Sequence, residues 1–173
     1  MAQRFLVLTV IGDDRPGLVG ELAAAIAGHE GNWLESAMSH LAGKFAGIVK
    51  VGIAAERIAG LQSDLGRLPG LAIRAEASEP AGTSGRRRLR MNLVGHDRIG
   101  IVREVSAALA RHGVNVEELA TRTESAPMSA EVLFHAQAEL TASPTVDVRA
   151  LVAELERISN DLMVEISLDE AHR

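Results

Sequence analysis

The chain contains one stretch of sequence twice, and this duplication limits the fold more than any other feature. Residues 11–22 (IGDDRPGLVGEL) reappear as residues 94–105 (VGHDRIGIVREV), each after an apolar run and before apolar residues with helical spacing. The similarity continues, with residues 27–32 (AGHEGN) matching residues 110–115 (ARHGVN). A shared order of strand, turn, helix and asparagine over this length predicts two copies of one small structural unit.

Composition limits the class of protein. The 173 residues are 47% hydrophobic, which is enough for an ordinary core, and the length suits two units of about 80 residues. A net charge of −5 does not favour electrostatic binding to nucleic acid, and the absence of cysteine excludes disulfides and thiol chemistry. No apolar run approaches the ~20 residues that cross a bilayer. We therefore expect a soluble cytoplasmic protein.

The first copy shows alternating strand and helix patterns. Residues 4–11 are apolar on both faces, as in a strand in the middle of a sheet with little exposed surface. A helix is predicted from Gly17 until residues 29–31, then strands over 33–41 and 44–54, a helix through 58–68 and a strand over 71–76. The order is β-α-β-β-α-β.

The second copy repeats this order. Strands are predicted near 88–93, 114–123, 128–138 and 162–168, with helices near 101–109 and 148–158. The sequence thus predicts an α+β fold of two ferredoxin-like βαββαβ units, each an antiparallel sheet with helices on one face. The first domain is predicted over 1–77, a linker rich in turn formers over 78–86, and the second domain over 87–173.

The duplicated loop is similar to that of a known family. A βαββαβ unit with GDDRPGLV (residues 12–19) in its first turn and an asparagine at the head of its second strand resembles the ACT domain, a small regulatory module that binds amino acids. Two such units, and the sequence of residues 95–105 (GHDRIGIVREV), resemble the glycine cleavage system transcriptional repressor family, whose members are tandem ACT proteins. Ile99 stands where proline is usual in the second copy, which we expect to loosen that turn.

The loop also has a direct physical interpretation. Free backbone N–H groups at a helix start attract a carboxylate, and an aspartate just before the helix can accept from an ammonium group. An amino acid needs both kinds of partner, and an asparagine amide donates and accepts. The candidate ligand-binding residues are Asp14, Pro16, Gly17, Leu18 and Asn32 in the first copy, and Asp97, Ile99, Gly100, Ile101 and Asn115 in the second.

A plainer alternative stays open for these residues. Asp14 and Asp97 could simply be helix N-caps, and the glycines could only turn the chain. His29 and His112 lie at equivalent helix ends, where a cation near the last carbonyl groups is favourable and metal binding is the lesser alternative. His96 beside Asp97 lacks a third metal ligand.

Other residues give no enzymatic signal. No nucleophile stands in an activating motif, so the sequence predicts no catalytic residue, no metal and no cofactor. The arginines at positions 86, 87, 88 and 90 are interpreted as a solvated strand face at the linker exit. Three Phe, one Trp and no Tyr are too few aromatic residues for the RNA-binding version of this topology.

The resemblance implies a function. It suggests a non-enzymatic regulatory protein that binds a small amino acid, such as glycine or serine, and modulates a partner protein such as a transcription factor. That control would act on amino-acid or one-carbon metabolism. The alternative is a ligand-free interaction module or a regulatory subunit of a metabolic enzyme. Direct contact with nucleic acid or a membrane is not expected, and a homodimer is compatible with the architecture.

Overall fold

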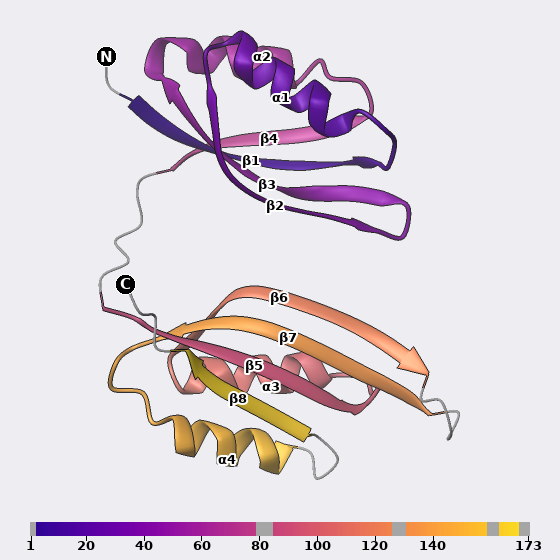
Figure 1. Cartoon of the computed structure of the whole chain (residues 1–173), viewed down its shortest axis with the longest axis vertical. Helices are drawn as coiled ribbons and strands as arrows, with labels where there is room; N and C mark the ends of the chain where they lie inside the picture. The colour runs from indigo at the N-terminus through magenta and orange to yellow at the C-terminus, as the bar shows by residue number, and fades with distance from the viewer. Residues whose placement is uncertain (1–2, 79–84, 126–130, 159–162, 170–173) are drawn as a thin grey trace. The chain divides into compact units, whose positions relative to one another are not determined.

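The computed structural model describes residues 3–78, 85–125, 131–158 and 163–169 of the chain. It divides into two compact units, unit 1 (Met1–Gly82) and unit 2 (Thr83–Arg173), as Figure 1 shows. Most of the predicted linker, residues 79–84, lies outside the described residues. Within the described ranges, no helix has the length and apolar character needed to cross a membrane.

Unit 1 has the predicted order of elements. These are β1 (Gln3–Asp13), α1 (Leu18–Gly28), β2 (Asn32–Leu41), β3 (Lys44–Ala54), the short 3-10 helix η1 (Ala55–Arg57), α2 (Ile58–Leu65) and β4 (Leu71–Ser78). The antiparallel sheet has the strand order β2-β3-β1-β4, and both helices cover the same face (Figure 1). The predicted βαββαβ, α+β fold is confirmed.

Unit 2 repeats this topology. Its elements are β5 (Arg87–His96), α3 (Ile101–Arg111), β6 (Val114–Ser125), β7 (Val132–Ala142), α4 (Val148–Ile158) and β8 (Met163–Asp169), with strand order β6-β7-β5-β8. The predicted end of the third strand at residue 138 is wrong, because Leu140 and Ala142 continue the alternation into the core. Residues 128–130 of that predicted strand lie outside the described part.

Each unit has its own core between sheet and helices. In unit 1, alternate residues of the central strands face α1 and α2, which contribute the leucines and isoleucine of their inner sides. The buried cluster contains Leu6, Leu8, Val10, Leu22, Ile26, Val49, Val51, Ile53, Leu61 and Leu65. Unit 2 has an equivalent cluster made of its own residues.

The prediction that β1 has little exposed surface is wrong for one of its faces. Leu6, Leu8 and Val10 are buried under the helices, but Thr9 and Ile11 on the opposite side are exposed. A strand that is apolar on both sides therefore lies in a sheet whose second face is not covered within unit 1. This uncovered side is called the open face below.

Candidate functional site

The two duplicated loops connect β1 to α1 and β5 to α3 with the same backbone conformation at their glycines. Gly17 has φ 95° and ψ −11°, and Gly100 has φ 91° and ψ −1°. This is the left-handed region, which glycine enters without the steric cost that a Cβ atom brings. Ile99 in place of Pro16 leaves this conformation unchanged.

The aspartates of the loops are not helix caps. Gly17 and Gly100 occupy the N-cap positions, and neither helix has a side-chain capping hydrogen bond. The backbone N–H of Asp14 donates to the Gly43 carbonyl at 3.0 Å, which fixes the loop on the β2–β3 hairpin. The capping interpretation is therefore wrong, and the Asp14 carboxylate is 43% exposed, with His40 Nε2 at 3.6 Å from Oδ2.

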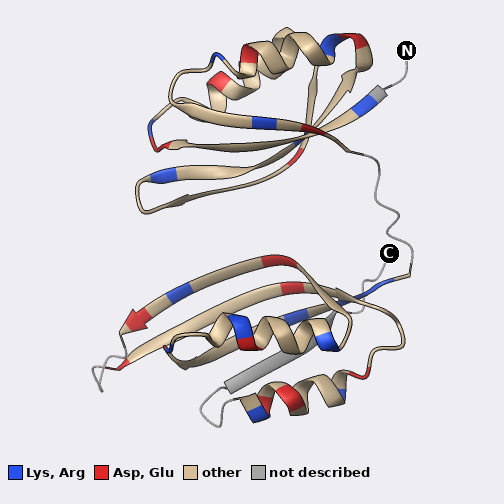
Figure 2. Ribbon diagram, turned by 180° about the vertical axis from the view of Figure 1, so that it is seen from behind, with Lys and Arg blue, Asp and Glu red and all other residues tan. Residues whose placement is uncertain are grey.

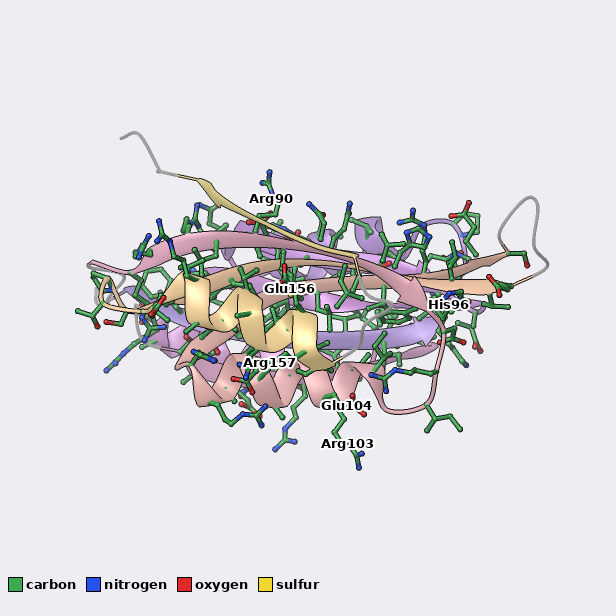
Figure 3. All side chains as sticks on the ribbon, turned by 90° about the horizontal axis from the view of Figure 1, so that it is seen from below. Arg90, His96, Arg103, Glu104, Glu156 and Arg157 are labelled. Atoms are coloured by element: carbon green, nitrogen blue, oxygen red, sulfur yellow. The ribbon has the colours of Figure 1, made fainter. Side chains whose placement is uncertain are left out.

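An arginine in each loop instead braces the helix start. The Arg15 guanidinium donates to both oxygens of Glu21 at 2.7 Å, and that of Arg98 donates to both oxygens of Glu104 at 3.0 and 2.7 Å. These hydrogen bonds lower the pKa of both glutamates. Figure 3 labels Glu104 near the beginning of α3. We name these two contacts the Arg–Glu forks.

The Arg–Glu forks are structural contacts beside the candidate site that were not identified from the sequence. The sequence did contain a sign of these contacts, because an arginine and a glutamate recur at the same spacing in both copies. Arg15 also donates to the Pro69 carbonyl at 3.2 Å, so one side chain joins the loop, the helix and the turn before β4. A bidentate pair of this kind fixes geometry as well as charge.

A hollow of about 250 Å³ opens over the N-terminus of α1. It is lined by Asp14, Arg15, Gly17, Leu18, Val19, Gly20 and Phe45. Backbone N–H groups of a first helical turn have no acceptor within the helix, so they can donate to a ligand. Asp14 supplies a carboxylate at the same place, and Val19 and Phe45 supply apolar walls. The hollow thus offers donors and an acceptor side by side.

The two adjacent aspartates of unit 1 have different surroundings. Asp13 forms an ion pair with Lys44, whose hydrogen bond lowers the Asp13 pKa. Asp14 lines the hollow, and its carboxylate lies 3.6 Å from His40 Nε2. Only Asp14 is placed to accept from a ligand in the hollow.

The structure brings together only part of the predicted set in unit 1. Asp14, Gly17 and Leu18 line the hollow, whereas Pro16 belongs to the loop without lining it. Asn32 pairs with Gly52 at the opposite end of the sheet. Seven residues of β1 separate the two ends, which corresponds to about 23 Å of strand. Asn32 and Asp14 of one unit therefore cannot contact the same amino acid.

Phe45 was not identified from the sequence. It pairs with Gly12 across β1 and β3, and so lies beside the loop although it is distant in the chain. Only the register of these strands reveals its position.

In unit 2 the structure likewise does not bring all the candidate residues together. Asp97 and Ile99 are exposed, and Ile101 is buried in the core. Asn115 lies at the far end of the sheet from the loop, where its amide donates to Glu117 at 2.8 Å. Glu117 also accepts from Thr141 at 2.6 Å, and these bonds lower its pKa.

The histidines at the helix ends join helices. His29 Nε2 lies 2.7 Å from Asp64 Oδ2 of α2, and His112 Nε2 lies 2.7 Å from Glu154 Oε2 of α4. Both histidines stand at the C-cap of their helix, as expected, and their side chains in addition contact the second helix of the unit. Across the ranges that the structure describes, no group of three His, Cys, Asp or Glu residues could hold a metal ion.

The arginines near the start of unit 2 contact protein groups. Arg90 forms an ion pair with Glu139 at 2.7 Å and points away from the helices (Figure 3). Arg87 donates to the carbonyl groups of Pro144 and Val146 at 3.5 and 3.4 Å. Figure 2 shows basic and acidic segments interleaved along α3 and α4. The described residues of these two helices form no continuous basic stripe, whereas Arg86, Arg87 and Arg88 follow one another at the start of unit 2.

The comparisons with known proteins agree with this architecture. A family model of the ACT domain matches residues 4–72, which include the loop and the hollow of unit 1. A search of curated protein sequences finds no significant match.

Two solved structures share the whole two-unit fold. A protein from Galdieria sulphuraria, described only as an unknown protein, is 27% identical, with a TM-score of 0.82 over 97% of this chain and 99% of that chain. A protein provisionally assigned as a glycine cleavage system transcriptional repressor is 15% identical, with a TM-score of 0.71 over 98% of this chain and 100% of that chain. At 15% identity, the similarity to this second protein shows a shared fold alone.

Proposed function

We propose that this chain, which is a tandem ACT domain protein, is a non-enzymatic regulator that binds a small amino acid in the hollow of unit 1. The observation that carries the proposal is the hollow itself, where the Asp14 carboxylate lies beside the free donors of the α1 first turn. The ligand carboxylate would accept from these N–H groups, and its ammonium group would donate to Asp14.

The polar groups and the walls of the hollow favour a small ligand. Arg15 is already held by Glu21, so it offers no free guanidinium to a second carboxylate. Phe45 and Val19 leave an apolar wall for a short side chain. Glycine and serine fit this description, and we take them as the first candidates.

The regulated partner is proposed to be a protein. The similarity in fold to the provisional glycine cleavage system repressor suggests transcriptional control of amino-acid or one-carbon metabolism in the cytoplasm. The interleaved charges of α3 and α4 suit a protein partner such as a transcription factor better than DNA. Ligand binding would alter this contact.

Calorimetric titration of the full chain with glycine and serine tests the site. We expect Asp14→Asn to weaken binding ten- to hundredfold, since a charge-assisted hydrogen bond is lost. Asp13→Asn is the matched control, because this neighbouring carboxylate faces Lys44 and should leave affinity unchanged. Asp97→Asn should leave the affinity of this hollow unchanged, because Asp97 belongs to the loop of unit 2 and does not line it.

A thermal-shift screen with all common amino acids precedes the titration. A ligand that binds only the folded state raises the melting temperature by mass action. If no amino acid at millimolar concentration raises it, the ligand-binding proposal fails, and a ligand-free interaction module or enzyme subunit replaces it.

A further inference from the structure

We propose that the open face of the unit 1 sheet is a contact surface between two copies of this chain. The face lies opposite the side covered by α1 and α2. Strand register places Val7, Ile11, Ala37, Ala46, Ile48 and Ala72 together on it. This inference does not depend on amino-acid binding.

The apolar side chains of this face lie in the middle of the sheet. β1 and β3 are the two central strands, yet Ile11 is 48% exposed and Ile48 is 52% exposed. Thr9 pairs with Ile48. The neighbouring Ala37 and Ala46 have small side chains that project little from the sheet. Exposed apolar side chains gathered on one face of a sheet are typical of an interaction site.

Unit 2 provides an internal comparison, because it has the same fold. Where unit 1 has Val7, Ala46 and Ile48, unit 2 has Arg90, His135 and Gln137 at the equivalent register positions. The fold therefore does not require apolar residues on this face. Ile11 and Ala37 have apolar equivalents in unit 2, Val94 and Ala120, so the difference lies at the three other positions. The additional apolar residues of unit 1 point to a contact that unit 2 does not make with its own open face.

The charges of the face favour a second copy as the partner. Asp13 pairs with Lys44, Glu35 lies 3.8 Å from Lys50, and Glu76 lies 3.0 Å from Arg74. Since these three acidic and three basic side chains balance one another, a partner with a large net charge would find little net attraction to them. A second copy related by a two-fold axis presents the same balanced set, as an isologous interface requires.

The size of the face sets the expected affinity. Four strands ~4.8 Å apart and about eight residues long cover roughly 500 Å² in projection. A standard stable interface buries about 800 Å² per partner. We therefore expect a reversible dimer that dissociates in the micromolar range.

Sedimentation velocity of the full chain between about 1 and 500 μM tests the surface. Wild type should show a concentration-dependent monomer–dimer equilibrium, and Ile48→Glu should raise the dissociation constant at least about tenfold, because it buries a charge. Ile11→Glu should act in the same way from a second position. Both residues are half-exposed, and circular dichroism would verify that the variants stay folded. Gln137→Glu, at the position of unit 2 equivalent to Ile48, is the matched control and should change nothing.

A second variant separates the face from the sheet edge. Leu34 lies on the edge strand β2 and is 42% exposed, so Leu34→Glu would disturb pairing of β2 with another strand. Dimers that survive Ile48→Glu but are lost with Leu34→Glu would overturn the proposal. A chain that remains monomeric at every concentration would overturn it as well.

Discussion

At the scale of single residues, Gly17 and Gly100 determine where α1 and α3 begin. Both adopt positive φ at the N-cap, and the helix follows at the next residue. The backbone turns there without a side-chain cap, so the first-turn N–H groups remain available to a ligand. The conformation of one glycine and the exposure of the proposed site are thus connected.

Replacing Gly17 with alanine should destabilise the protein. An added Cβ would meet only Glu21 Oε1, at 3.8 Å, so the cost comes from the left-handed backbone and not from a clash. We expect a loss of about 1–2 kcal/mol in the free energy of unfolding, measured by urea denaturation. Gly20→Ala is the control: it lies inside α1 with nothing within 4 Å, and alanine there should stabilise by about 0.5–1 kcal/mol. Equal effects of the two substitutions would contradict this account.

At this scale, the loop could be identified from the sequence, but the residues that lie beside it in the fold could not. Asp14 and Gly17 were visible because the duplicated motif singles them out. Phe45 and the contact of Arg15 with Pro69 depend on how distant strands and turns pair, which spacing along the chain does not contain. For the same reason, Asn32 was grouped with the loop although it lies at the other end of the sheet.

At the scale of elements, the two units differ in how the space between the first helix and the edge strand is filled. In unit 1 that space holds Trp33 and Met38 of β2, and Val49 of β3. The register equivalents in unit 2 are Val116, Thr121 and Ala138, which are smaller. An apolar crevice of about 20 Å³ remains between α3, β6 and β7.

Filling this crevice should stabilise unit 2. Ala138 is 3% exposed and lines the crevice, and its equivalent in unit 1 is Val49. We expect Ala138→Val to raise the free energy of unfolding by about 0.5–1.5 kcal/mol, as cavity-filling substitutions do. Ala120→Val, on an exposed position of β6, should change it by less than about 0.5 kcal/mol. A destabilised Ala138→Val variant would show that the crevice cannot accept two more methyl groups.

Element types were predictable from periodicity, but the surroundings of the elements were not. All predicted strands and helices with described residues exist, since turn formers and apolar spacing delimit them. The pattern of β1, apolar on both sides, was assigned to burial within the sheet. The same pattern arises when one face meets helices and the other is open, so sequence alone cannot distinguish a core from an interface.

At the scale of the whole molecule, each unit has a separate core. Among the residues whose burial is described, the buried cluster of unit 1 lies between Leu6 and Leu65, and that of unit 2 lies between Leu89 and Leu155. The division between Gly82 and Thr83 falls in the segment predicted as a linker. We therefore propose that residues 1–77 and 87–173 are independent domains.

A fragment of residues 1–82 should fold alone. It retains every residue of its buried cluster and all four strands of its sheet. A domain of this length is expected to have a free energy of unfolding of roughly 4–12 kcal/mol and to unfold in a single cooperative transition, which circular dichroism during heating would measure.

Residues 1–70 form the control, because this fragment lacks β4, which pairs with β1 from Phe5 to Gly12. Without that strand one edge of β1 loses its partner, so the shorter fragment should show no cooperative transition. If the longer fragment also melts without cooperativity, unit 1 depends on the rest of the chain and is not an independent domain.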